Sequence, residues 1–234
     1  YFLMIKTTTD INEIIVFASM WNMDGLILMG FCEANYEKLR NQMRISFVVY
    51  DGYFDKSSKF VNLVIDHYDG GYKAGEYFKK LGHKKALCIS DNYICMDKER
   101  IDGFCKAFAQ GETVIWQIPN TKKERVQFYR DKFLELSMLG ITGVFAVSDY
   151  YALDFMQFLQ GRGVRIPKDL QIIGMDDSIA SRESIPALTT IHQDADLRAK
   201  TAIECIEDMR EGRDFGTRIV LPVKLIKRES TGKL

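Results

Sequence analysis

Residues 143–177 read GVFAVSDYYALDFMQFLQGRGVRIPKDLQIIGMDD, and this stretch decides the fold. Gly143–Val147 is a short, continuous apolar run, which is typical of a strand buried on both faces. Tyr150–Gln160 then has apolar residues at helical spacing, and Leu170–Met175 is a second apolar run. A strand, a helix and another strand in this order predict a parallel sheet covered by helices.

The same alternation extends in both directions along the chain. It predicts an α/β architecture, and about ten strands are more than one such sheet usually carries, so we divide them between two lobes. A short apolar run at residues 1–5 is a further candidate strand. The other predicted strands lie at 25–30, 45–50, 60–65, 86–90, 113–118, 188–191 and 218–226, and the other helices at 10–21, 34–43, 68–81, 97–110, 122–139 and 196–210.

Length and composition agree with this architecture. The chain has 234 residues, and at about 150 residues per domain it holds one large or two modest cores. Apolar residues make up 47% and charged residues 27%, as in ordinary globular proteins. Lys plus Arg and Asp plus Glu both total 32, so the net charge is zero. This balance argues against a nucleic-acid-binding surface formed by bulk charge in these residues.

The five cysteines form no C-x-x-C pair and no zinc spacing, which predicts reduced thiols in a cytoplasmic protein. No stretch approaches the roughly 18 apolar residues of a membrane span, and no signal peptide is apparent, so we expect no membrane partner. Residue 1 is Tyr rather than Met, and we expect the chain to begin inside a longer polypeptide.

Polar residues gather where predicted strands end. In open α/β sheets, ligands bind outside the carboxyl ends of the strands. A mixture of carboxylates with one arginine suits a polyhydroxylated ligand, because carboxylates accept hydrogen bonds from hydroxyls and a guanidinium donates them. The residues at these ends are Asp66, His67, Asp69, Arg100, Ser148, Asp149, Asp176 and Asp177.

Each of these residues also has a purely structural interpretation. Ser148 or Asp149 would be an ordinary helix N-cap, Arg100 a solvated helix charge, and Asp176 a turn cap. The three histidines share no metal-ligand spacing, so we predict no metal site and no cofactor. Phosphate-loop, dinucleotide, nucleophile-elbow and H-E-x-x-H motifs are missing, which favours a protein that is not an enzyme. A glycosidase-type pair of Asp149 and Asp176 stays open.

Several ordered motifs resemble one family. Residues 65–90 (IDHYDGGYKAGEYFKKLGHKKALCIS), Lys98–Phe104 (KERIDGF), 143–177, Pro186–Asp194 (PALTTIHQD) and Lys227–Leu234 (KRESTGKL) are similar to the effector-binding core of LacI/GalR-type transcription regulators. That core has a periplasmic-binding-protein-like type I fold with two flavodoxin-like, Rossmann-like lobes. The resemblance runs from about residue 24 to 230.

The resemblance also implies a site and a division into lobes. Asp69, Arg100, Ser148 and Asp176 match the family's ligand contacts, and with Asp149 they form the predicted effector site. The chain crosses between lobes, so residues 1–82 plus 188–212 form the N-terminal lobe and residues 83–187 plus 213–234 form the C-terminal lobe. The first strand and helix of the N-terminal lobe are expected to precede residue 1, as is a DNA-binding helix-turn-helix.

The implied function is that of the sensing and dimerisation core of a DNA-binding repressor. A small sugar or related metabolite would bind between the lobes, and a homodimer would pass the change to operator DNA. The first alternative is a solute-binding protein of a sugar transporter, which has the same architecture. The second is an enzyme that uses the same strand-end residues.

Overall fold

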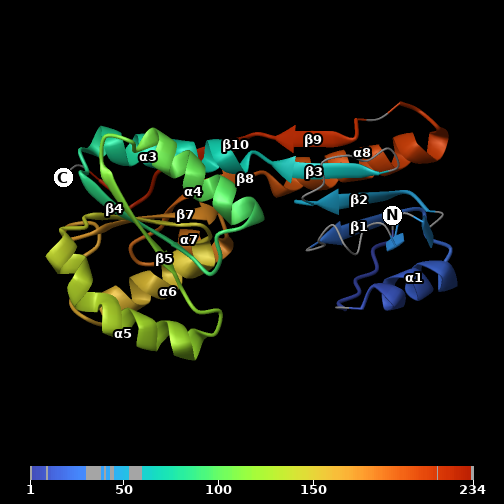
Figure 1. The fold of residues 1–234 in the computed structure, drawn as a ribbon. Helices are drawn as coiled ribbons and strands as arrows, with labels where there is room; N and C mark the ends of the chain where they lie inside the picture. Colours follow the sequence, from blue (N-terminus) through green and yellow to red (C-terminus); the bar gives the residue numbers. More distant parts are fainter. Residues whose placement is uncertain are drawn as a thin grey trace. The chain divides into compact units, whose positions relative to one another are not determined.

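The computed structural model describes residues 2–8, 10–29, 38–39, 41–42, 45–52, 60–214 and 216–232. The chain forms two compact units, the first from residues 1–65 and 194–221 and the second from residues 66–193 and 222–234. Each unit has its own sheet with helices (Figure 1). The predicted α/β class, with parallel sheets in two lobes and a chain that crosses between them, is confirmed.

The first unit is built on a parallel sheet with the strand order β1-β2-β3-β9. Its strands are β1 (Leu26–Met29), β2 (Phe47–Tyr50), β3 (Val61–Ile65) and β9 (Arg218–Leu221). β1 lies at the edge of this sheet, and Met29 is 68% exposed. The continuous apolar run at residues 25–30 predicts a strand buried on both faces, but Ile27 and Met29 leave one face of β1 exposed, so this prediction is wrong.

Two helices of the first unit have clear sequence signals. α1 (Ile11–Met20) begins after Asp10, whose carboxylate accepts the N–H of Asn12 as an N-cap. Ile14 of α1 joins the apolar core that includes Phe47 of β2. α8 (Ala195–Glu211) ends at Gly212, which has a positive φ of 67° as a helix C-cap.

The second unit has a six-stranded sheet with the order β10-β8-β7-β6-β4-β5. Only β10 runs antiparallel to its neighbour; the other pairs are parallel. The parallel neighbours β4, β6, β7 and β8 therefore end at the same edge of the sheet. The strands are β4 (Lys85–Ser90), β5 (Glu112–Gln117), β6 (Gly143–Ala146), β7 (Gln171–Asp176), β8 (Thr189–Gln193) and β10 (Val223–Ile226).

Helices cover both faces of this second sheet, α3 and α4 on one side and α5 and α6 on the other (Figure 1). Side chains of β4 alternate between the faces, and Leu87 and Ile89 join the core that contains Phe155 of α6. On the opposite face, Phe104 of α4 stacks on Phe145 of β6 with ring centroids 5.2 Å apart. The helices are α3 (His67–Leu81), α4 (Cys95–Ala107), α5 (Lys122–Leu139), α6 (Asp149–Gln160) and the short α7 (Ile179–Glu183).

Glycines let α3 and α4 cross at close range. A Cβ added to Gly71 of α3 would lie 1.8 Å from the carbonyl oxygen of Arg100. A Cβ added to Gly103 of α4 would lie 2.1 Å from the carbonyl oxygen of Tyr68. Both distances are far below any real contact, so only glycine fits at these two positions. The crossing holds the first turn of α3 against the middle of α4.

The crossing points between units differ from the expected ones. The chain changes unit after residues 65, 193 and 221, whereas the sequence suggests changes after residues 82, 187 and 212. α3 belongs to the second unit because its glycines pack against α4. The predicted strand 218–226 is two strands, β9 and β10, which pair with different sheets on either side of Pro222. Proline cannot donate a ladder hydrogen bond, so it suits this break.

Two further predictions have mixed outcomes. Residues 2–8 form no regular secondary structure, and Phe2 and Ile5 are more than four-fifths exposed, so the predicted strand at 1–5 is wrong for the part described. The predicted helix at 34–43 lies mostly outside the described residues, although residues 38–39 and 41–42 are helical. Among the described residues, no helix combines the length and apolar character needed to cross a bilayer.

Candidate functional site

The site lies in the second unit, at the carboxyl ends of its central parallel strands. We call Asp97, Arg100, Asp149 and Asp176 the strand-end cluster. Arg100 and Asp97 come from α4, Asp149 is the first residue of α6, and Asp176 is the last residue of β7. Three of the five predicted site residues therefore come together, and Asp97 joins them.

Arg100 is buried, with 9% of its surface exposed. Its Nε donates to Nδ1 of His67 at 3.1 Å, and its Nη1 donates to the carbonyl oxygen of Val147 at 2.7 Å. Because Nδ1 of His67 accepts this bond, the neutral imidazole carries its proton on Nε2. Nη2 makes no hydrogen bond within the described part of the chain, which leaves its two N–H groups for a ligand. The interpretation of Arg100 as a solvated helix charge is wrong.

Asp97 lies beside this guanidinium, with one oxygen 3.6 Å from Nη1 of Arg100. Its other oxygen accepts hydrogen bonds from Oγ of Ser90 at 2.6 Å and from Nδ2 of Asn92 at 3.2 Å. Burial raises the pKa of Asp97, while the Ser90 hydrogen bond and the charge of Arg100 act in the opposite direction. The carboxylate is thus fixed at the end of β4.

Asp149 is almost fully buried and has hydrogen bonds on both oxygens. Oδ1 accepts from Oγ1 of Thr190 at 2.6 Å, and Oδ2 accepts from the N–H and the Oγ of Ser178 at 2.8 and 2.9 Å. Burial raises the pKa of Asp149, although these hydrogen bonds oppose the rise. Asp149 therefore ties α6 to the segments that follow β7 and form β8.

Asp176 has the most perturbed carboxyl group of the cluster. Burial raises its pKa to about 6; Arg100 lowers the pKa, and the charges of Asp149 and Asp97 raise it. Nε2 of Gln193 donates to Oδ1 of Asp176 at 3.0 Å. Asp176 also has a φ of 126°, a conformation that side-chain-bearing residues rarely adopt. Perturbed carboxyl groups and unusual backbone angles cluster at functional sites.

The neighbouring Asp177 is a structural residue by comparison. It forms ion pairs with Arg228, with Arg182 at 3.1 Å and with Nδ1 of His192 at 2.8 Å. Burial opposes its ionisation, but the hydrogen bonds from these partners outweigh burial and lower the pKa of Asp177. The second carboxylate of the pair thus stabilises the turn that presents Asp176.

The two remaining predicted residues have local partners. Ser148 is the N-cap of α6, and its Oγ accepts the N–H of Tyr151 at 3.3 Å. The structural interpretation of Ser148 as a helix N-cap therefore holds. Asp69 lies in the first turn of α3 and forms an ion pair with Lys73. Its side chain is 37% exposed, and in the part of the chain described it pairs with Lys73 rather than with the strand-end cluster.

The sequence places His67 at a strand end but not in the predicted effector site, and it does not identify Asp97 at all. Asp97 precedes Arg100 by three residues on a helix, and this spacing places both on one face, so a helical plot would have found it. His67 is 33 residues from Arg100, and its contact depends on the α3 and α4 crossing, for which the sequence has no local signal. The sequence also offers Tyr53, Phe54, Tyr93 and Trp116 as aromatic faces for a sugar. Trp116 is buried in the core, Tyr93 donates a hydrogen bond to Asp102, and Tyr53 and Phe54 lie outside the described residues.

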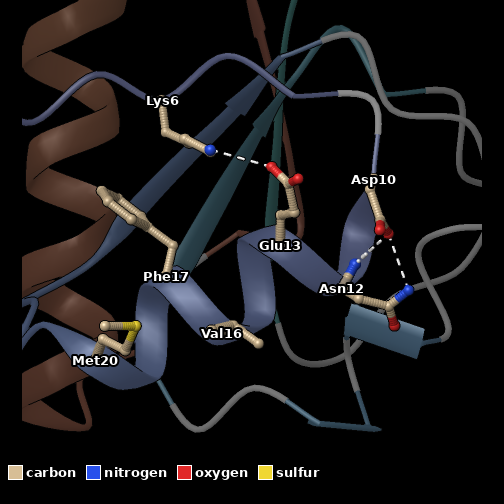
Figure 2. Close-up of a pocket in the computed structure, with 7 residues that line it drawn as sticks. All are labelled: Lys6, Asp10, Asn12, Glu13, Val16, Phe17 and Met20. Carbon is tan, nitrogen blue, oxygen red and sulfur yellow. Dashed lines mark hydrogen bonds and ion pairs between the residues drawn. The ribbon is translucent and has the colours of Figure 1, made fainter.

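A pocket of about 350 Å³ lies elsewhere, in the first unit along α1 (Figure 2). Lys6 and Glu13 form an ion pair of 3.0 Å beside it, and Phe17 and Met20 supply apolar surface. It contains none of the predicted site residues. Within the described ranges, no group of three or more His, Cys, Asp or Glu side chains could hold a metal ion.

Comparisons with known proteins relate this chain to a family. Residues 76–231 match the periplasmic binding protein-like domain. The chain is 28% identical over 222 residues to the HTH-type transcriptional repressor PurR of Vibrio cholerae, covering 90% of this chain and 65% of that protein. It is 32% identical over 176 residues to the HTH-type transcriptional regulator DegA of Bacillus subtilis, covering 74% of this chain and 52% of that protein. The chain thus spans less than two thirds of either relative.

A solved structure agrees with the sequence matches. The LacI family transcriptional regulator from Enterococcus faecium, solved with bound ribose, has a TM-score of 0.79 and 27% identity, and the match covers 97% of this chain and 86% of that one. The chain therefore belongs to the periplasmic binding protein-like domain family, and the predicted resemblance to the cores of LacI/GalR-type regulators is confirmed.

Proposed function

We propose that these residues are the ligand-sensing and dimerising core of a LacI/GalR-type transcriptional repressor in the cytoplasm. A small sugar or related metabolite binds at the strand-end cluster, and a homodimer passes the change to operator DNA through a DNA-binding domain outside this chain. Coupling between two such sites is typically about 1–3 kcal/mol, which changes operator occupancy severalfold or more.

One observation carries the proposal: in the described part of the chain, Nη2 of the buried Arg100 has no hydrogen-bond partner, and the guanidinium is close enough to Asp176 to lower the pKa of its carboxyl group. A ligand with adjacent hydroxyl groups could accept hydrogen bonds from Arg100 and donate to Asp176 at the same time. We assign direct contacts to these two residues. Asp149 and Ser148 hold the start of α6 in place. Asp69, in the first turn of α3, is a further proposed ligand contact.

The relatives support a regulator over the alternatives. The matched proteins are described as transcriptional repressors or regulators, and the Enterococcus faecium regulator binds ribose. A solute-binding protein of a transporter is the less favoured candidate. Hydrolysis by an Asp149 and Asp176 pair is also disfavoured, because Ser178 and Thr190 occupy both oxygens of Asp149.

Calorimetry on the full-length protein tests the site with ribose and a panel of uncharged pentoses and hexoses. We expect one of these sugars to bind. We expect Arg100→Ala and Asp176→Asn each to lower the affinity for that sugar by about 10- to 100-fold, the range for a hydrogen bond to a charged group. Lys80→Ala on the exposed face of α3 is the control and should bind normally. Unchanged affinity in both site variants would reject the assignment.

Operator binding tests the regulator class separately. Fluorescence anisotropy with genomic DNA fragments from the region around the protein's own gene should detect specific binding by the full-length protein. The sugar identified by calorimetry should shift that binding, and the shift should disappear in Arg100→Ala. A full-length protein with no DNA affinity would favour the solute-binding alternative.

A further inference from the structure

The charge balance of the strand-end cluster is unequal. Asp97 lies beside the guanidinium of Arg100, and Asp176 is influenced by the charges of Arg100, Asp149 and Asp97. Asp91, which directly follows β4, adds a fourth carboxyl group close to Asp97. The interactions of Asp176 with Asp149 and Asp97 show that the carboxyl groups are near enough to influence one another. A ligand at Arg100 therefore meets an excess of negative charge.

Asp97 is the carboxylate that most directly controls Arg100. It is 3.6 Å from Nη1, the nitrogen that also donates to the carbonyl oxygen of Val147. An arginine binds a phosphate or carboxylate best through two parallel N–H groups, one on each of two nitrogens. In Arg100, one of these nitrogens, Nη1, is already engaged by Asp97 and by the carbonyl oxygen of Val147. The remaining donors on Nη2 are sufficient for a hydroxyl oxygen.

Hydrogen bonds fix the position of the Asp97 carboxylate. Its side chain is 15% exposed, and Ser90 and Asn92 both donate hydrogen bonds to Oδ2, whereas Oδ1 is the oxygen that pairs with Arg100. These donors come from the end of β4 and the turn that follows it. They hold the carboxylate beside the guanidinium and favour its ionised form. Moving Asp97 away from an incoming anion would break both hydrogen bonds.

We propose that Asp97 is a specificity-determining residue that restricts the effector to molecules without a negative charge. This inference rests on the proposed function, since it concerns the effector site. Like charges placed together in a buried site are strongly disfavoured, so phosphorylated or carboxylated metabolites are excluded while uncharged sugars and polyols are accepted.

Sulfate is the probe, because its charge does not change over the working pH range and it needs no knowledge of the natural effector. Calorimetry would compare the full-length wild type, Asp97→Asn, Asp97→Glu and the double variant Asp97→Asn with Arg100→Gln. We expect Asp97→Asn to bind sulfate at least about tenfold more tightly than the wild type. Asp97→Glu keeps the charge and should exclude sulfate. The double variant should lose the increase in sulfate affinity that Asp97→Asn produces.

The outcomes separate this inference from the proposed function. Equal sulfate affinity in wild type and Asp97→Asn would overturn it and leave Asp97 with a structural role only. If Asp97→Asn does not fold, the wild type still decides, because saturable sulfate binding that Arg100→Gln abolishes would refute charge exclusion. Failure of every uncharged sugar to bind would reject the proposed effector class while leaving the sulfate comparison intact.

Discussion

At the scale of single residues, Asp176 and Asp177 show how adjacent identical side chains acquire opposite properties. Burial raises the pKa of Asp176 to about 6, whereas hydrogen bonds from Arg228, Arg182 and His192 overcome burial and lower the pKa of Asp177. Both have positive φ values, 126° and 56°. Asn is the matched substitution at both positions, because it keeps the size of Asp, removes the charge, and is among the side-chain-bearing residues found most often at positive φ.

The raised pKa of Asp176 predicts a stability cost. The folded protein holds this proton more tightly than the unfolded chain, whose Asp pKa is near 3.8. The contribution of Asp176 to stability therefore falls as pH rises from about 4 to about 6, and the penalty is complete above about pH 6. We expect Asp176→Asn to gain about 1–3 kcal/mol in the free energy of unfolding at about pH 7.5, and little at about pH 4.

Asp177→Asn is the matched control and should have the opposite sign. Its lowered pKa stabilises the folded state above the unfolded pKa, and this contribution is lost as pH falls. We expect a loss of about 1–3 kcal/mol at about pH 7.5. Urea unfolding at both pH values measures each change. A stability loss in Asp176→Asn that is independent of pH would contradict the assigned cost.

At the scale of elements, the crossing of α3 and α4 places the site residues. Gly71 and Gly103 let the two backbones approach, and this contact brings His67 of α3 to the guanidinium of Arg100. The sequence shows a Gly-Gly pair inside a helix, which lowers helix propensity, but gives no sign of what packs against it. Only the packing explains why α3 belongs to the second unit.

Gly71→Ala tests this crossing. Its Cβ would overlap the carbonyl oxygen of Arg100, so the helices must separate. We expect a loss of about 3 kcal/mol in the free energy of unfolding, together with weaker sugar binding, because Arg100 would move relative to His67. Lys79→Ala, on the exposed side of α3, should change neither urea unfolding nor calorimetry. A Gly71→Ala protein with wild-type stability would show that the two backbones are not in tight contact.

At the scale of the whole molecule, the chain leaves the second unit for α8 and β9 of the first and returns to the second at Pro222. The returning segment closes the second unit. Ser230 is fully buried; its Oγ donates to the carbonyl oxygen of Ile172 at 2.6 Å and accepts the N–H of Thr189 at 2.8 Å. Ser230 thus connects β7 with β8.

Loss of the Ser230 hydroxyl group should destabilise the second unit. Ser230→Ala leaves a buried carbonyl oxygen and a buried N–H without partners, and we expect a cost of about 2–4 kcal/mol. Hydrogen exchange should show the loss of protection in β7 and β8, whereas Lys224→Ala, on the solvent side of β10, should leave protection unchanged. Equal protection in Ser230→Ala and wild type would refute this role.

The sequence by itself determined the class of the fold, most helix and strand positions, and the strand-end locations of Arg100, Asp149 and Asp176. These features follow from local periodicity and from the rule that parallel strands end together, so neighbouring residues suffice to reveal them. Tertiary structure alone decided the edge position of β1, the split at Pro222, the unit to which α3 belongs, and the contacts of Arg100 with His67 and Asp97. These features depend on which surfaces pack together, and packing joins residues that local patterns cannot connect.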